Sequence, residues 1–297
     1  MELRVLRYFL AVARESSITG AANYLHLTQP TLSRQLQDLE KELGQKLLIR
    51  GKSHVTLTPE GVMLRKRAQE IVEMVEKTES ELKSMNDIVG GDIYIGCGET
   101  ESMKYIAKVM KELREEYPDI KFHIYSGNAE DVTEKLDKGL FDFGVLIQPI
   151  DLSKYDNITI PQKDVWGVIM KKDSPLAEKS FITLEDIVGK PIIASRQMSK
   201  KYSCDSGFLD WFGKSFETLN IVATYNLVYN AAIMVNVGMG YAVTLDKLVD
   251  VTNNSDICFR PLSPKLESKL DIVWKKNQVF SPASKIFLEK LYRKFIS

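Results

Sequence analysis

Apolar residues recur at helical spacing near the start of the chain and predict two short helices. The first covers residues 2–14. Its apolar face is formed by Leu3, Leu6, Phe9, Leu10 and Ala13. The second covers residues 18–25, with Ser16 or Ser17 as the expected N-cap. Its inward-facing residues are Ala21, Ala22 and Leu25, and the two alanines would allow other helices to approach closely.

A third helix is predicted up to about Leu43. Thr28 is the expected N-cap, with its hydroxyl accepting a backbone N–H, and Pro30 is tolerated in the first turn. The buried stripe is Leu32, Leu36, Leu39 and Leu43, and Gly44 ends the helix. Because only residues 26–28 separate the second and third helices, the pair is typical of a helix-turn-helix, whose second helix enters the DNA major groove.

The face opposite that leucine stripe carries side chains suited to base and phosphate contacts, namely Gln29, Thr31, Ser33, Arg34 and Gln37. A solvated polar face is the alternative, since every amphipathic helix has one. The cap, the turn and the alanine pair all favour the DNA-reading interpretation. Residues 47–50 and 54–58 then predict two short strands of a hairpin wing, with Arg50 and Lys52 at its tip.

A long helix is predicted over residues 59–88, with Thr58 as its cap, Pro59 in its first turn and Glu60 at the positive end of its dipole. Its apolar positions alternate at spacings of four and three residues: Leu64, Ala68, Ile71, Val75, Leu82, Met85 and Val89, interrupted by Thr78. A 3.5-residue repeat indicates a partner helix, and therefore a two-fold dimer through Leu64, Ala68, Ile71, Val75, Leu82 and Met85. A helix lying on its own domain is the alternative.

After Gly90 and Gly91, which we interpret as a hinge, strands alternate with helices. The predicted strands are 92–97, 121–126, 141–147, 165–170, 191–194, 221–224, 241–244 and 269–274. The predicted helices are 102–116, 129–138, 184–187, 207–216, 227–237 and 281–295. This order is typical of parallel sheets with helices on both faces, and the restart after Pro149 indicates a second half.

Composition narrows the class of protein. The chain has 297 residues, which favours two or three folded units, with 44% hydrophobic and 27% charged residues and a net charge of zero. Residues 1–60 hold eight Lys/Arg against six Asp/Glu, so the DNA interpretation depends on the motif rather than on charge. No secretion signal or membrane-spanning run is evident, and we expect a cytoplasmic protein.

The sequence contains little that indicates a cofactor site or a catalytic site. Cys97, Cys204 and Cys258 show neither zinc spacing nor a disulfide framework, so idle thiols are favoured over a redox switch. Three scattered histidines cannot supply a catalytic set with a nucleophile and an acid. The Gly-x-Gly pairs lack the third glycine of a dinucleotide site. We therefore expect no enzyme, no metal and no cofactor.

The stretch AANYLHLTQPTLSRQLQDLEKELGQKLLIR, followed by VTLTPEG, resembles the N-terminal signature of LysR-type transcriptional regulators. Leu48 departs from the phenylalanine that is usual in this family, which affects packing under the wing. The resemblance places DNA contacts on Gln29, Pro30, Thr31, Ser33 and Arg34, with Thr28, Gln37, Arg50 and Lys52 as our further candidates. It also implies that dimers pair into tetramers.

The resemblance continues through YPDI at 117–120, LDKGLFD at 136–142 and VNVGMGY at 235–241. It implies an α/β sensor domain of two lobes, similar to a periplasmic solute-binding protein. The expected domains are 1–58 for the winged helix-turn-helix, 59–89 for the linker helix and 90–297 for the effector-binding domain. Lobe one would comprise about 91–161 and 267–297, and lobe two about 162–266.

An effector is expected between the lobes, past the carboxyl ends of the strands, where helix N-termini converge. The candidate residues in these turns are Thr100, Ser102, Asn128, Gln148, Arg196 and Asn226. Arg196 would suit a carboxylate or phosphate, whereas Glu99 and Glu101 would favour an amine or a hydroxylated ligand. Simple helix capping is the alternative for Thr100, Ser102, Asn128 and Asn226.

These features predict a DNA-binding transcriptional regulator controlled by a small-molecule effector. A solute-binding protein or an enzyme with a spurious helix-turn-helix is the alternative, and an architectural DNA-binding protein would leave the cleft collapsed. The expected partners are double-stranded DNA at a pseudo-palindromic site, the effector, further copies of the chain and RNA polymerase, with no membrane.

Overall fold

The structure is a computed structural model that describes residues 1–51, 54–84, 90–196, 211–213, 218–252 and 254–296. The chain divides into two compact units, Met1–Lys83 and Ser84–Ser297, which we call the N-terminal and C-terminal units. None of the helices in the described ranges is both long and apolar enough to cross a lipid bilayer.

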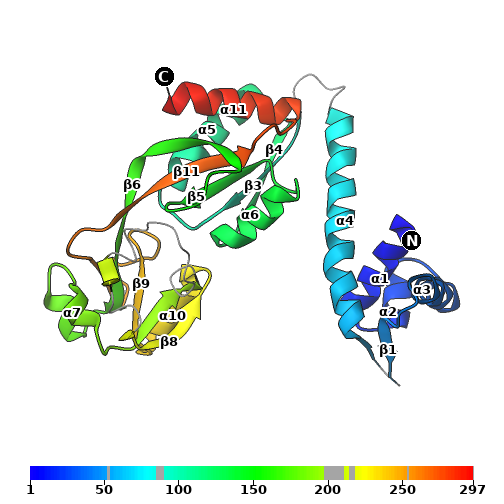
Figure 1. The fold of residues 1–297 in the computed structure, drawn as a ribbon, viewed down its shortest axis with the longest axis horizontal. Coiled ribbons are helices and arrows are strands. Elements are labelled where there is room, and N and C mark those ends of the chain that lie inside the picture. Colours follow the sequence, from blue (N-terminus) through cyan, green and yellow to red (C-terminus); the bar gives the residue numbers. More distant parts are fainter. Residues whose placement is uncertain (52–53, 85–89, 197–210, 214–217, 253, 297) are drawn as a thin grey trace. The chain divides into compact units, whose positions relative to one another are not determined.

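The N-terminal unit begins with three helices, α1 (Leu3–Glu15), α2 (Ile18–Tyr24) and α3 (Gln29–Leu43) (Figure 1). The three helices meet in one core, to which α1 contributes Phe9 of its predicted face, while Leu3, Leu6 and Leu10 of that face pack against α4 (Pro59–Ser84) instead. Its buried side chains are Val5, Phe9, Ala11, Val12, Ala21, Ala22, Leu32, Leu36, Leu39, Leu47 and Leu48. Burial of both alanines confirms the predicted close packing of α2. Leu43, the last residue of the predicted stripe, is 38% exposed instead.

The helix ends follow the predicted caps with one exception. The Ser17 hydroxyl accepts the N–H of Gly20 at 3.1 Å, and Gly44 has the left-handed φ of 64°. Thr28 occupies the N-cap position of α3, but its hydroxyl hydrogen-bonds to the Thr31 hydroxyl at 2.8 Å and caps no backbone N–H. The expected backbone cap at Thr28 is therefore wrong, because the neighbouring side chain takes its place.

The predicted wing is an antiparallel pair of strands, β1 (Leu48–Arg50) and β2 (Val55–Leu57). It is attached to α3 through Glu40, whose buried carboxylate accepts the N–H groups of Leu47 and Leu48 at 2.9 and 3.2 Å. A buried carboxylate needs such donors, because leaving it without partners costs free energy. The wing therefore has a fixed position relative to α3.

The long helix α4 (Pro59–Ser84) starts as predicted, with the Thr58 hydroxyl accepting the N–H of Gly61 at 3.0 Å. Its first half packs on its own unit. Ala68 and Val72 are buried against Leu6 of α1, and Leu64 is partly buried there. Leu64 and Ala68 therefore belong to the core of one subunit, which corrects the expectation that the whole heptad row is a dimer seam.

Further along α4, the side chains of the predicted heptad row are more exposed to solvent. Ile71 is 39% and Leu82 60% exposed, and Val75 is partly exposed. Met85 lies outside the described residues. The apolar positions left on the surface of α4 also include Val62 and Met63, off the predicted row.

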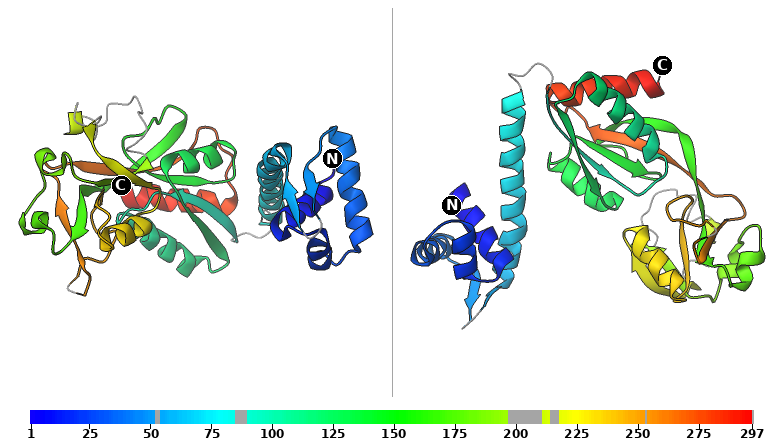
Figure 2. Two further views of the ribbon diagram at one scale, coloured as in Figure 1. Left: turned by 90° about the horizontal axis from the view of Figure 1, so that it is seen from below. Right: turned by 180° about the vertical axis from the view of Figure 1, so that it is seen from behind.

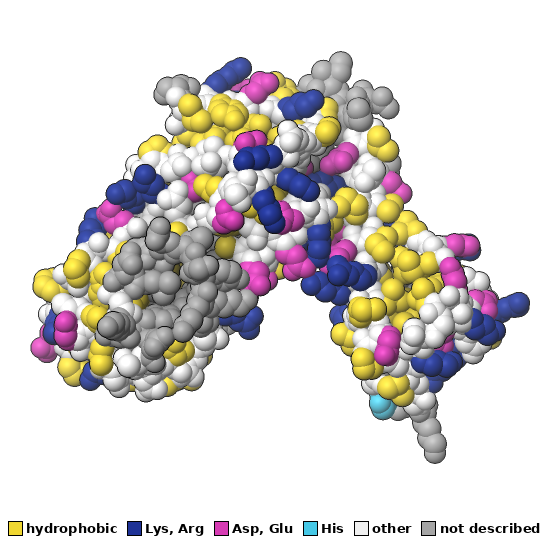
Figure 3. All heavy atoms as spheres, viewed as in Figure 1, with side chains coloured by type: hydrophobic (Ala, Val, Ile, Leu, Met, Phe, Trp, Pro, Cys, Tyr) yellow, Lys and Arg dark blue, Asp and Glu magenta, His cyan; other side chains and the backbone are white. Residues whose placement is uncertain are grey.

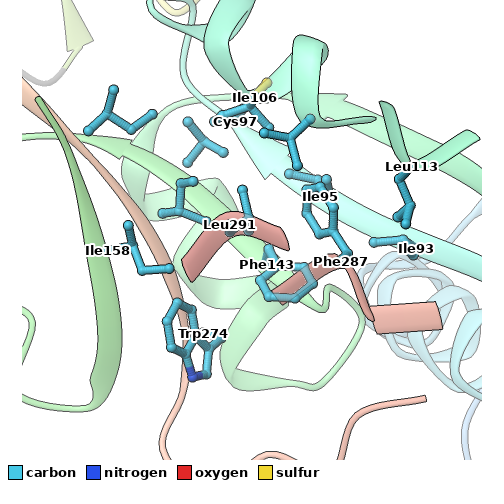
Figure 4. Close-up of a cluster of buried hydrophobic side chains, with 14 of the residues drawn as sticks. Ile93, Ile95, Cys97, Ile106, Leu113, Phe143, Ile158, Trp274, Phe287 and Leu291 are labelled. Atoms are coloured by element: carbon cyan, nitrogen blue, oxygen red, sulfur yellow. The ribbon is translucent and has the colours of Figure 1, made fainter. Parts of the chain in front are cut away.

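In the C-terminal unit, lobe one is a sheet between two layers of helices (Figures 1 and 2). Its parallel strands are β3 (Gly91–Cys97), β4 (Ile120–Ser126) and β5 (Phe143–Ile147). Helices α5 (Met103–Glu116) and α11 (Pro282–Phe295) pack on one face through a core that contains Phe143 and Phe287 (Figure 4). Helix α6 (Ala129–Asp137) packs on the other face through Val132 and Leu136.

Two long antiparallel strands, β6 (Tyr155–Lys171) and β11 (Glu267–Lys275), connect the lobes. Their pairing shifts register where Lys269, opposite Lys163, is followed by Leu270, opposite Ile160. The sequence predicted only residues 165–170 of β6, because residues 155–164 are largely polar and show no clear alternation. The 17-residue strand forms because β11 supplies backbone partners over residues 155–165, and β9 and β10 supply them over residues 166–171.

Lobe two repeats the layered arrangement. Its sheet contains the second half of β6 with β9 (Tyr241–Leu245), β7 (Ile192–Ser195) and β8 (Ile221–Tyr225), and β10 (Ile257–Pro261) pairs with β6 on the other side. Helix α10 (Val228–Asn236) covers one face through Val228, Ala231 and Val235. A 3-10 turn η1 (Pro175–Glu178) and the short helix α7 (Leu184–Ile187) lie on the other. Strand β10 was not predicted, and the predicted helix 207–216 lies largely outside the described residues.

Candidate functional site

The polar face of α3 is open to solvent. Six of the predicted DNA contacts in and before this helix are exposed: Thr28, Gln29, Pro30, Thr31, Arg34 and Gln37. The opposite face is buried in the core, so these side chains project away from the unit. The beginning of a helix also offers backbone N–H groups to an anion such as a phosphate. This surface has the chemistry and the accessibility that reading a DNA groove requires.

Ser33 and Arg50 are coupled to each other. The Arg50 guanidinium donates from Nη1 to the Ser33 hydroxyl at 3.0 Å, and its Nη2 lies 4.0 Å from a carboxylate oxygen of Glu40. Arg50 thereby connects the first strand of the wing to the middle of α3. Lys52, the other wing candidate, lies outside the described residues.

A cavity of about 50 Å³ lies between the lobes of the C-terminal unit. Lobe one contributes Gly98, Glu99, Gly127, Asn128, Ala129, Val145, Leu146 and Ile147. Lobe two contributes Trp166, Ser195, Arg196, Tyr225, Asn226, Val228, Thr244, Leu245 and Leu248. Since one water molecule requires ~10–15 Å³ by this measure, the cavity in this form has room for a few waters or a very small ligand. Apolar walls with a few polar groups are typical of a ligand site.

Three of the six predicted effector residues line this cavity: Asn128, Arg196 and Asn226. Asn128 also caps α6, because its side-chain oxygen accepts the N–H of Asp131 at 2.9 Å. Capping and cavity lining are therefore compatible at this residue.

The other three residues are engaged elsewhere. The hydroxyls of Thr100 and Ser102 donate to the two carboxylate oxygens of Asp164 on β6, the second at 2.8 Å. Gln148 donates from Nε2 to the fully buried Asp271 on β11 at 2.6 Å. Thr100 and Ser102 are both buried, and none of the three residues lines the cavity. In this form their polar groups connect lobe one to the crossover strands, where buried carboxylates require donors.

Glu99 and Tyr225 also line the cavity with polar groups, although neither was among the predicted contacts. Glu99, in the turn after β3, accepts the N–H of Val228, the first residue of α10, across the cleft. Tyr225 is buried and donates to the carbonyl of Val243 at 2.7 Å. Burial raises the pKa of the Tyr225 phenol to about 12, so it stays protonated and able to donate. A hydrogen bond between residues of the two lobes leaves no local signal in the sequence. Glu99 could be singled out only as an acidic residue in a predicted ligand turn.

Two of the cysteines are inert in character. Cys97 and Cys258 are buried free thiols, and burial raises the pKa of each above its ordinary value. A raised pKa lowers the fraction of reactive thiolate. Cys204 lies outside the described residues.

Profiles of known families match nearly the whole chain. The bacterial regulatory helix-turn-helix profile of the lysR family covers residues 3–62, and the LysR substrate binding domain profile covers residues 87–295. The chain thus belongs to the LysR family of transcriptional regulators, with a helix-turn-helix DNA-binding domain and an effector-binding domain.

Individual relatives agree along their full length. The chain is 31% identical to the Hca operon transcriptional activator HcaR of Escherichia coli K12, over 97% of this chain and 96% of the relative. It is 27% identical to the regulator YvbU of Bacillus subtilis 168, covering 97% of each. A solved structure of full-length CbnR with its target DNA shares the fold, with a TM-score of 0.75, 19% identity and coverage of 99% of this chain and 100% of that one.

Proposed function

We propose that this regulator reads DNA with the exposed face of α3 and the wing. The supporting observation is that Gln29, Thr31, Arg34 and Gln37 form an open polar face on a helix whose opposite face is buried through Leu32, Leu36 and Leu39. The resemblance to a DNA-bound relative is consistent with this assignment. Arg34 would contact guanine or phosphate, and Gln29 and Gln37 would contact adenine.

The proposal includes a dimer through the outer part of α4. Ile71 and Leu82 are apolar, exposed and eleven positions apart, a spacing that keeps them close together on one face of a helix. Figure 3 shows further hydrophobic side chains on the visible surface of the N-terminal unit. Burying such residues against the α4 of a second copy would place two reading helices on a pseudo-palindromic site. Tetramer formation and contact with RNA polymerase are further parts of the proposal.

The cavity between the lobes is proposed to bind, and not to convert, a small effector. Binding would stabilise one relative pose of the lobes over another, and an effector shifts such an equilibrium only as far as its affinities for the two poses differ. The altered pose would then change how the subunits of the oligomer are arranged on DNA.

A gel shift tests this function. The purified full-length chain is incubated with the DNA upstream of its own gene, at stated salt, with and without a panel of small carboxylates, amino acids and amines. We expect a specific shift whose mobility or footprint changes with one compound. A specific shift that responds to none of them would contradict the effector part, and failure to select any specific site from genomic DNA would contradict the DNA part.

A further inference from the structure

Glu99 provides a carboxylate that α10 itself lacks. Helix α10 has no side-chain cap bond at its N-cap residue Leu227 and no acidic residue in its first turn. The backbone N–H groups at a helix start carry partial positive charge and are stabilised by an anion. Here the anion comes from lobe one, because the Glu99 carboxylate accepts the N–H of Val228.

The same two residues line the cavity. The start of α10 is therefore also a place where the carboxylate of a ligand in this cavity would be stabilised. Glu99 already occupies that place, and a cavity of about 50 Å³ would hold a second carboxylate close to the first. Two carboxylates held within one cavity of this size repel each other strongly, whereas a cationic nitrogen is attracted to the Glu99 carboxylate.

The residues that line the cavity include few charged side chains. Among the cavity residues, Glu99 is the acidic group and Arg196, which follows β7 in lobe two, is the basic one. Within the described residues, Val228 is the one hydrogen-bond partner of the Glu99 carboxylate, and it is bound by a single oxygen. The second oxygen of Glu99 is thus left to accept a donor from a ligand.

We propose that Glu99 sets the charge selectivity of this cavity: it fills the anion position at the start of α10, so that the effector brings a cationic nitrogen to Glu99 instead of a carboxylate to the helix. This inference rests on the proposed ligand-binding role of the cavity.

The test uses thermal unfolding of the full-length chain with two probes of equal size, sodium propionate and propylamine hydrochloride, at matched ionic strength. The variants are Glu99→Ala, Glu99→Gln and Glu101→Ala. Glu101 lies two residues away and pairs with Lys104 at 2.9 Å, so it is the matched control. Sodium chloride at the same concentration controls for general salt effects.

For the wild type and Glu101→Ala we expect Tm to rise by about 2–4 °C with saturating propylamine and to stay unchanged with propionate. In Glu99→Ala the response should reverse, because propionate enters the vacated anion position. Glu99→Gln keeps the shape and the acceptor but loses the charge, and should lose the propylamine response even if Glu99→Ala folds poorly.

Three results would overturn the proposal: stabilisation of the wild type by propionate, no propionate response in a folded Glu99→Ala variant, or a propylamine response that survives in Glu99→Gln. The gel shift without added compounds measures the DNA-binding part separately. Failure of the selectivity proposal is thereby distinguishable from failure of the proposed regulator function.

Discussion

Arg50 on the wing donates a hydrogen bond to the hydroxyl of Ser33 on α3, 17 residues earlier in the chain. The two residues belong to the two elements expected to contact DNA. The Glu40 carboxylate on α3 also accepts hydrogen bonds from the backbone at the start of the wing. The wing and the helix are therefore positioned as one rigid surface. A change at Ser33 would therefore alter the position of Arg50 as well as the contacts of Ser33.

Arg34→Ala should weaken binding to the operator by about 1–3 kcal/mol, because Arg34 is exposed on the reading face and a bidentate contact to a base has that value. Titration by fluorescence anisotropy at two salt concentrations measures the loss. Lys41→Ala is the matched control, since Lys41 is an exposed cation near the far end of the same helix. Equal losses for both variants would contradict a specific role for Arg34.

Leu82→Asp should dissociate the dimer without unfolding the subunit, because Leu82 is 60% exposed and a desolvated charge is costly in an apolar interface. Sedimentation velocity measures the oligomeric state. Arg65→Asp introduces the same carboxylate at an exposed position of α4 outside the predicted row, and it should leave the dimer intact. A dimeric Leu82→Asp variant would place the interface elsewhere.

Thr100→Val should destabilise the C-terminal unit by about 1–3 kcal/mol, because the buried Asp164 carboxylate loses a hydroxyl donor. Urea unfolding followed by circular dichroism provides the measurement. Thr252→Val, in an exposed turn, is expected to change stability by less than about 0.5 kcal/mol. If Thr100→Val is as stable as the wild type and fails only to respond to an effector, then Thr100 is a ligand contact after all.

Tyr225→Phe should change the dependence of stability on alkaline pH. The pKa of Tyr225 is about 12 in the folded chain, above the ordinary value of 10.0. Its protonated form therefore stabilises the folded state fully below pH 10, and this contribution is lost as the pH rises toward 12. The difference in unfolding free energy between the wild type and Tyr225→Phe should shrink over that range.

The control for this measurement is Tyr229→Phe on the neighbouring α10, where the side chain is 72% exposed. This variant shows the effect of removing a phenol hydroxyl that is not buried. A constant difference for Tyr225→Phe over this pH range would mean that burial does not hold its proton.

Local patterns were sufficient to predict most of the elements. The leucine stripe of α3 and the alanines of α2 are short-range signals, and apart from Leu43 both are buried as expected. The wing and the alternation of strands and helices were equally predictable, because periodicity reports which face of an element is buried. Prediction from local patterns was insufficient on α4. The heptad row does not distinguish a residue in a dimer interface from one such as Ala68, which packs on α1 of the same subunit.

The site was less predictable than the fold, because its contacts join residues that are far apart in the chain. Thr100 and Asp164 are separated by 64 residues, and Glu99 and Val228 by 129. A hydroxyl in a turn after a strand suits a ligand, a cap or a distant carboxylate equally well. The choice of Asp164 as its partner depends on where β6 crosses between the lobes.

The crossover strands also determine how the two lobes move relative to each other. Strands β6 and β11 run side by side, and their regular pairing breaks at one place, where Leu270 follows Lys269. The ladder of backbone hydrogen bonds is disrupted at this break, and we expect the lobes to rotate most easily about an axis through it. Displacement grows with distance from such an axis, and a small change of angle at the cavity becomes a larger shift at the outer helices of each lobe.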